Sequence, residues 1–196
     1  MIIELGHFAL VLALAVALYQ TVVPQWGAWR NDATLMASAS VAAVLQLALL
    51  TVAFAALTHA YITSDFSVLN VAENSHSAKP LLYKLSGVWG NHEGSMLLWV
   101  SILALFGAAV AVFGRDLPET TKARILSVQG SVGLAFLTFI AVASNPFLRL
   151  VPPPVEGNGL NPILQDPALA FHPPFLYGGY VGLSIAFSFA VAALIE

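Results

Sequence analysis

The chain contains no cysteine among its 196 residues. This absence excludes disulfides, thiolate-bound iron–sulfur clusters, zinc ribbons and any thioether or mixed disulfide formed by the chain itself. Any covalent chemistry on sulfur must therefore belong to a partner.

Charged residues are also scarce. They make up 9% of the chain, against about a quarter of an ordinary soluble domain. The seven basic residues are scattered and the formal net charge is −3, so no basic surface is available to follow a phosphate backbone. We therefore expect no nucleic acid among its partners.

Hydrophobic residues, by contrast, account for 59% of the chain, and the mean hydropathy is +0.84. A helix that crosses a bilayer needs roughly 20 mostly apolar residues. We therefore predict an all-α, polytopic integral membrane helical bundle, a single region over residues 1–196 with about five transmembrane helices. The five apolar windows are Ile2–Val23, Ala37–Leu57, Ser95–Phe113, Ile125–Ala143 and Leu176–Ile195. The first window has Glu4 and no basic residue at its N-terminal end, which predicts a retained helix and not an export signal.

The basic residues predict which ends of these helices face the cytoplasm. Four of the seven fall in the short first and third loops, and short loops rich in lysine and arginine stay on the cytoplasmic side. The N-terminus and both long loops, Thr58–Gly94 and Ser144–Phe175, are then expected on the opposite side. Long loops on a helical scaffold are where functional residues gather.

The second loop ends in the glycine-rich aromatic segment KLSGVWGNHEGSMLLW. Ser95 is expected to cap the third helix, and Glu93 suits the positive end of a helix dipole. Two interpretations of Trp89 and His92 stay open. They line an apolar surface that faces a flat ligand, or they only orient the local structure.

The fourth loop begins with SNPFLRLVPPPVEGN, whose consecutive prolines favour an extended spacer. It continues as NGLNPILQDPALAFHPPFLYGGYVG, in which His172 stands before Pro173 and Pro174. A neutral imidazole is a common ligand of haem iron. The two prolines restrict the backbone and would thereby orient the His172 side chain. The residues alone leave a second interpretation open, in which the His172 ring forms hydrogen bonds with backbone carbonyls at the start of a helix.

The other polar and glycine positions are simpler to interpret. His7 and His59 lie near predicted helix ends, and His76 lies in a polar loop, so these three are expected to be ordinary interfacial or solvated residues. The glycines of the last helix remove side chains from one stretch of its surface, where a bulky group or another helix would pack. They are Gly178, Gly179 and Gly182.

Three of these segments, WGNHEGSMLLW, SNPF and GLNPILQDPALAFHPPFLYGGYVG, resemble in order and spacing the N-terminal part of CcmF-type cytochrome c haem lyases. The resemblance implies a subunit that receives b-type haem from the haem chaperone CcmE and acts with a CcmH-type subunit. Haem would then be attached to the CXXCH cysteines of apocytochrome c. It also implies that His172 is an external axial ligand of the haem iron in transit. The supporting residues that we expect around it are Trp89, His92, Pro173, Pro174 and Tyr177.

The chain also departs from that family. It lacks the tryptophan-rich WWD segment, the second external histidine and the later intramembrane histidines. We therefore expect that it does not complete the reaction alone, and we assign no catalytic residue. Either it is a fragment, or it is one chain of a split lyase whose WWD segment is on a separate chain.

The expected location is a bacterial inner membrane with the long loops in the periplasm, or alternatively a mitochondrial inner membrane. The competing function is a non-catalytic membrane scaffold or a transport subunit that binds partner helices. A transporter should carry charges near the middle of its membrane helices, and the five windows have none at their centres. Haem handling therefore ranks above transport.

Overall fold

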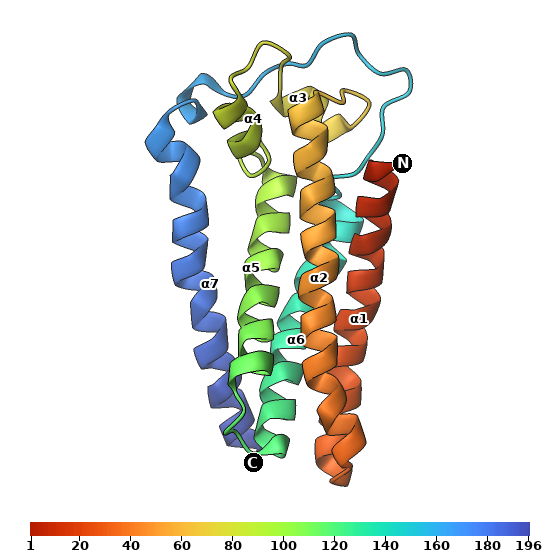
Figure 1. The fold of residues 1–196 in the computed structure, drawn as a ribbon, viewed down its shortest axis with the longest axis vertical. Helices are drawn as coiled ribbons and strands as arrows, with labels where there is room; N and C mark the ends of the chain where they lie inside the picture. The colour runs from red at the N-terminus through yellow and green to blue at the C-terminus, as the bar shows by residue number, and fades with distance from the viewer.

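The computed structural model describes all residues from 1 to 196 as an all-helical bundle (Figure 1). Long helices run side by side, and short helical segments and loops cover the end of the bundle at which the N-terminus lies. The α-helices are α1 Ile2–Arg30, α2 Ala33–Thr63, α3 Leu69–Asn74, α4 Leu81–Gly87, α5 His92–Phe113, α6 Glu119–Ala143 and α7 Pro167–Ile195, and a short 3-10 helix, η1, spans Pro162–Leu164.

Five of these helices are long and apolar enough to cross a membrane. This finding confirms the predicted fold class and the number of spans. The helices are longer than the apolar windows, because a window marks only the hydrocarbon-crossing part of a helix. Helix α1 continues past Val23 to Arg30. Arg30 therefore ends a helix and does not lie in a loop.

The first connection is consequently a very short turn. Asn31 takes a left-handed conformation with φ of 55°, and its amide bonds the Gly27 carbonyl oxygen. The Asp32 carboxylate then caps α2 by accepting from the amides of Thr34 and Leu35. A left-handed residue followed by an acidic cap is a common way to end one helix and begin the next.

Small residues allow the helices to approach closely at the loop end of the bundle. A Cβ placed on Gly6 of α1 would lie 2.5 Å from the Ala56 Cβ of α2 and 2.9 Å from the Phe147 ring. Phe147 belongs to the SNPF segment and is 3% exposed. The aromatic residue of this motif is therefore a core residue that fastens the start of the fourth loop against α1.

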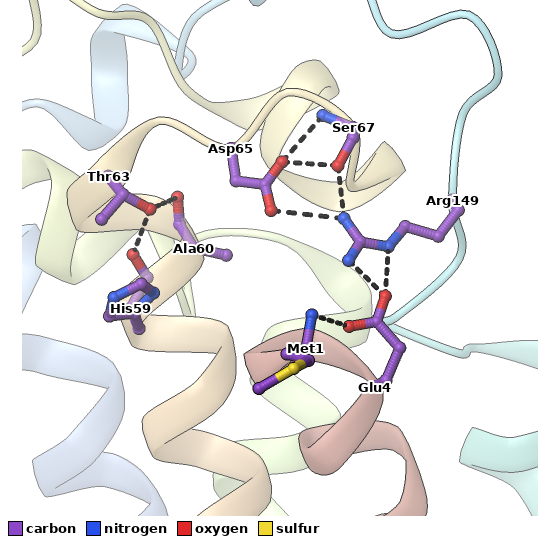
Figure 2. A network of polar contacts seen from close by, with 8 residues as sticks. All are labelled: Met1, Glu4, His59, Ala60, Thr63, Asp65, Ser67 and Arg149. Carbon is purple, nitrogen blue, oxygen red and sulfur yellow. Dashed lines mark hydrogen bonds and ion pairs between the residues drawn. The ribbon is translucent and has the colours of Figure 1, made fainter.

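Arg149 holds the start of the same loop through ion pairs and hydrogen bonds (Figure 2). Its guanidinium donates to the Glu4 carboxylate and the Ser67 hydroxyl, and lies 3.2 Å from the Asp65 carboxylate. The backbone on either side of Arg149 pairs with the start of α3, since the Leu69 amide donates to the Leu148 oxygen at 2.8 Å. The beginning of the predicted spacer is therefore folded onto α1 and α3.

The end of the spacer is held by a second carboxylate. Glu156 accepts from the amide and the hydroxyl of Ser77. These hydrogen bonds, with the Ser77 hydroxyl contributing most, lower the pKa of Glu156 to about 2. Between the two attachments, residues 151–155 are exposed and without regular structure, as a spacer requires.

Lys79 is a buried cation beneath these loops, and it provides the first test of the fold. Its ammonium donates to the Asn74 carbonyl oxygen at 3.0 Å and lies over the Tyr61 ring. Burial, assisted by the charge of Lys84, lowers the pKa of Lys79 from its ordinary 10.5 to about 8. Between these two pH values the unfolded chain holds a proton that the folded chain has lost, so the free energy of unfolding rises with pH.

We therefore expect the thermal unfolding midpoint in detergent to increase from pH 8 toward pH 10.5 relative to that of Lys79→Met. The stability difference across the full window should be roughly a few kcal/mol. Lys84→Met should retain most of the increase, since burial of Lys79 contributes more to its lowered pKa than the charge of Lys84 does. Parallel pH profiles for the wild type and Lys79→Met would contradict the assignment.

Candidate functional site

The WGNHEG segment forms a tight turn that leads into α5. The Asn91 side chain caps the helix, because its Oδ1 accepts from the Gly94 amide at 2.8 Å and its Nδ2 donates to the Gly87 carbonyl oxygen at 2.8 Å. The prediction that Ser95 is the cap was wrong. Helix α5 begins at His92, so Ser95 lies inside its first turn and donates to the His92 carbonyl oxygen.

A buried polar network holds this turn from behind. The Tyr61 hydroxyl donates to Asn70 Oδ1 at 2.7 Å, and Asn70 Nδ2 donates to Asn91 Oδ1 at 2.7 Å and to the Glu93 carboxylate at 3.2 Å. Sequence reasoning missed this network. An asparagine just before a helix is a capping signal that could have found Asn91, whereas Tyr61 and Asn70 come from distant segments that no local pattern connects.

Trp89 joins the turn to α7. Its indole N–H donates to the Ala170 carbonyl oxygen at 2.9 Å, and its ring stacks on Phe54 at a centroid distance of 6.4 Å. In a regular helix the Ala170 carbonyl would accept from residue 174, but Pro174 has no N–H. The Trp89 indole therefore donates to the carbonyl oxygen that Pro174 leaves without a backbone partner. The WGNHEG segment and the HPP segment are joined by this hydrogen bond.

A cavity of about 330 Å³ lies between this turn, the end of the fourth loop and the first turns of α7. It contains four of the residues predicted to act together, which are Trp89, His92, Pro173 and Tyr177. The remaining lining residues are Ser86, Gly90, Asn91, Ser95, Leu160, Leu164, Leu169 and Ala170.

His92 stands at the edge of this cavity. Its Nδ1 lies 2.9 Å from the Ser144 hydroxyl, and its ring meets Phe139 edge-on at 6.0 Å. The same histidine lines a second apolar cavity of about 440 Å³ between α5 and α6, together with Met96, Phe136 and Phe139. Its ring is therefore oriented by a hydroxyl and accessible from two sides.

His172 lies inside α7 and not at a loop boundary. The helix begins at Pro167, where Asp166 accepts from the amides of Ala168 and Leu169. The apolar window placed the start at Leu176 because proline usually interrupts a helix. The His172 side chain is exposed and makes no hydrogen bond within the chain, so it does not bond the backbone carbonyls at the helix start.

The side chain of His172 does not line this cavity. Residues three or four apart share a helix face, and the exposed Phe175, Leu176 and Leu183 follow this spacing from His172. Pro173 and Tyr177 instead face the cavity. The structure thus brings four of the predicted residues together and sets His172 beside them on the outer face, while Pro174 is half-buried and lines neither cavity.

The glycines of α7 differ from one another in their surroundings. A Cβ added at Gly178 or Gly179 would meet no atom within 4 Å, so both leave open surface. A Cβ on Gly182 would lie 3.2 Å from the Phe106 ring of α5. Gly182 therefore serves packing within this chain, and only the first two glycines offer room to another molecule.

The remaining histidines have local roles. His7 stacks on Phe147 with ring centroids 6.0 Å apart, and His76 accepts from the Ala78 amide. His59 is exposed on α2. No group of three or more histidine, aspartate and glutamate side chains is placed to hold a metal ion. Haem iron takes only one or two protein ligands, so it does not require such a group.

Comparison with known proteins identifies relatives over the whole chain. Residues 89–196 match the profile of the family described as cytochrome C assembly protein. The chain is 65% identical over its full length to the cytochrome c-type biogenesis protein ccl1 of Rhodobacter capsulatus, covering 30% of that protein. It is 47% identical over 98% of its length to the cytochrome c-type biogenesis protein CcmF of Escherichia coli, again covering 30% of the relative.

A solved structure agrees with this relationship. The cytochrome c haem lyase CcmF superimposes on 100% of the chain with a TM-score of 0.87 and 27% identity, and the chain covers 31% of it. The chain therefore spans about three tenths of the length of the relatives that it matches.

Proposed function

We propose that this chain, which belongs to the cytochrome c assembly protein family, holds haem in transit for attachment to apocytochrome c. The observation that carries the proposal is His172. Its imidazole is exposed, is free of internal hydrogen bonds and projects from α7 at the loop end of the bundle. A neutral imidazole in this position can ligate haem iron without disrupting any contact of the fold.

The surface around His172 fits a flat apolar ligand. Phe175 and Leu176 are exposed on the same face, and Gly179 leaves open space one turn further along the helix. The cavity beside this face adds the aromatic surfaces of Trp89 and Tyr177 and the oriented ring of His92. These residues would position the porphyrin, which is an orientation effect and not acid–base chemistry.

The partners proposed for the reaction rest on the likeness of this chain to CcmF-type haem lyases. The chain has no cysteine, so the thiols that react with the haem vinyl groups would be those of the CXXCH motif of apocytochrome c. In the proposed pathway haem comes from a CcmE-type chaperone and the apocytochrome from a CcmH-type subunit. A WWD segment outside these 196 residues would provide the remainder of the haem platform.

We propose that the loop end of the bundle faces the periplasm of a bacterial cell. Arg30, Arg115, Lys122 and Arg124 all lie at the opposite end, which the positive-inside rule assigns to the cytoplasm. At the loop end, Lys79 is buried and Arg149 is paired with two carboxylates. Lys84 is the remaining basic residue at the loop end and is half-buried, so four of the seven basic residues support this orientation.

The proposal is tested by purifying the protein with its associated subunits and recording oxidised and reduced absorption spectra before and after adding haem. We expect a histidine-ligated haem spectrum, and mass spectrometry should detect a partner that carries the WWD segment. Absence of any specific haem spectrum in the presence of that partner would contradict haem binding.

A scaffold function has a separate observation in its favour, which is the open surface at Gly178. If a partner helix packs there, Gly178→Leu should reduce co-purification of that partner by roughly tenfold, since interhelical contacts in membranes depend on small residues. Ala186→Leu, at an exposed position further along α7, is the matched control. Unchanged partner recovery with Gly178→Leu would exclude this surface as the docking site.

A further inference from the structure

A small polar cavity lies inside the membrane bundle, distant from the loops. It measures about 20 Å³ and is lined by residues of four helices. Gln20 comes from α1, Gln46 from α2, Gly107 from α5 and Gln129 from α6. Three glutamines around one cavity are unusual in a membrane interior, because each amide that is not hydrogen-bonded there is costly.

Some of the side-chain amide groups of these glutamines form hydrogen bonds within the chain. Gln20 Nε2 donates to the Leu126 carbonyl oxygen at 2.9 Å. Gln129 Nε2 donates to Ser184 Oγ at 3.0 Å, and Gln129 Oε1 accepts from the Ser188 hydroxyl at 2.8 Å. The Gln129 side chain thereby links α6 to α7, the helix that carries His172.

Two acceptors are not satisfied. The Oε1 atoms of Gln20 and Gln46 are buried and have no hydrogen-bond partner. These residues are only 3% and 6% exposed. Both residues line the cavity, so a hydrogen-bond donor placed there would lie beside the two residues whose acceptors have no partner.

We infer that this cavity binds one ordered water molecule, which donates one hydrogen bond to each of the two amide oxygens. A cavity needs about 10 to 15 Å³ of this volume measure to hold one water, and a buried water makes two to four hydrogen bonds. The volume of about 20 Å³ fits one water molecule and is too small for a larger ligand. Water also matches the need for two donors with no net charge.

The bound water joins α1 to α2, the hydrogen bond from Gln20 to the Leu126 carbonyl oxygen joins α1 to α6, and Gln129 joins α6 to α5 and α7. All five membrane-crossing helices are then connected by one hydrogen-bonded layer. Hydrogen bonds have directions, unlike apolar contacts, so this layer fixes the rotation of each helix about its axis. The inner part of α7 is held in this way although most of its surface is exposed.

The test uses the protein in lipid nanodiscs with ¹⁵N-labelled glutamine. We expect long-lived magnetisation transfer between water and the side-chain amides of Gln20 and Gln46. Gly107→Ala should abolish this transfer, since the added methyl group enters the cavity and meets only Gln129 Cγ at 3.5 Å. Gly179→Ala adds the same methyl group at an open position and should leave the transfer unchanged.

Absence of transfer at both amides in the wild-type protein would show that the cavity is dry and would overturn the inference. Transfer that persists in Gly107→Ala would also overturn it, because the water would then lie outside this cavity. Both glycine positions have space for a methyl group, so the folded protein remains available for measurement.

Discussion

His172→Ala should lower the affinity for haem by at least about 100-fold, which corresponds to roughly 3 kcal/mol. The substitution removes the only group on the outer face of the first turns of α7 that can bind iron, while Phe175 and Leu176 still offer an apolar surface. Residual haem should therefore bind weakly and without the histidine-ligated spectrum. Haem titration followed by absorption spectroscopy measures both effects.

The control for this variant is His76→Ala. His76 is also accessible and lies at the loop end, but it is a local residue of the turn beside Glu156. Its replacement should leave the haem spectrum unchanged. Since the His172 side chain makes no hydrogen bond within the chain, we expect the substitution to leave the fold intact. Wild-type affinity and spectrum in His172→Ala would refute the ligand assignment.

Gly94→Ala should have the largest effect on stability, at least about 3 kcal/mol. A Cβ at this position would lie 1.6 Å from the Val88 carbonyl oxygen and 2.8 Å from the Val88 carbonyl carbon. These atoms belong to the backbone and cannot rotate away. The turn must therefore open, which breaks the Asn91 cap and moves Trp89 from the Ala170 carbonyl.

Thermal unfolding in detergent measures this loss, with Gly178→Ala as the control because nothing lies within 4 Å of its added methyl group. The Trp89 fluorescence environment reports whether the connection to α7 breaks. A Gly94→Ala protein that is as stable as Gly178→Ala would show that the turn does not have the packing described for residues 88–94.

The sequence predicted correctly the features that depend on residues close together in the chain, such as the membrane-crossing helices and the family motifs. Apolar windows identified all five membrane-crossing helices, because a bilayer imposes a minimum length of apolar helix. The motifs around His92 and His172 identified the family, since they are contiguous strings. Helix ends were less certain, as Ser95 and Leu176 show, because capping residues and prolines outside the apolar windows decided where α5 and α7 begin.

The arrangement of the site depended on contacts between distant segments. Trp89 and Ala170 are 81 residues apart and meet through one hydrogen bond, and the Tyr61, Asn70 and Asn91 network joins three separate segments. No local pattern encodes such pairings. The side of α7 that faces the cavity was likewise decided by packing, which separates His172 from Pro173 although they are adjacent in the chain.

The sequence by itself therefore determined that this protein is a helical membrane bundle of the cytochrome c assembly family, and it singled out His172, which precedes two prolines, as the candidate ligand. Only the tertiary structure decided that this histidine lies on the open face of α7, that the WGNHEG turn holds the helix through the carbonyl freed by Pro174, and that the glutamines share one cavity. The physical reason is that composition and periodicity specify which surfaces are apolar, whereas the hydrogen bonds of buried polar groups specify which surfaces meet.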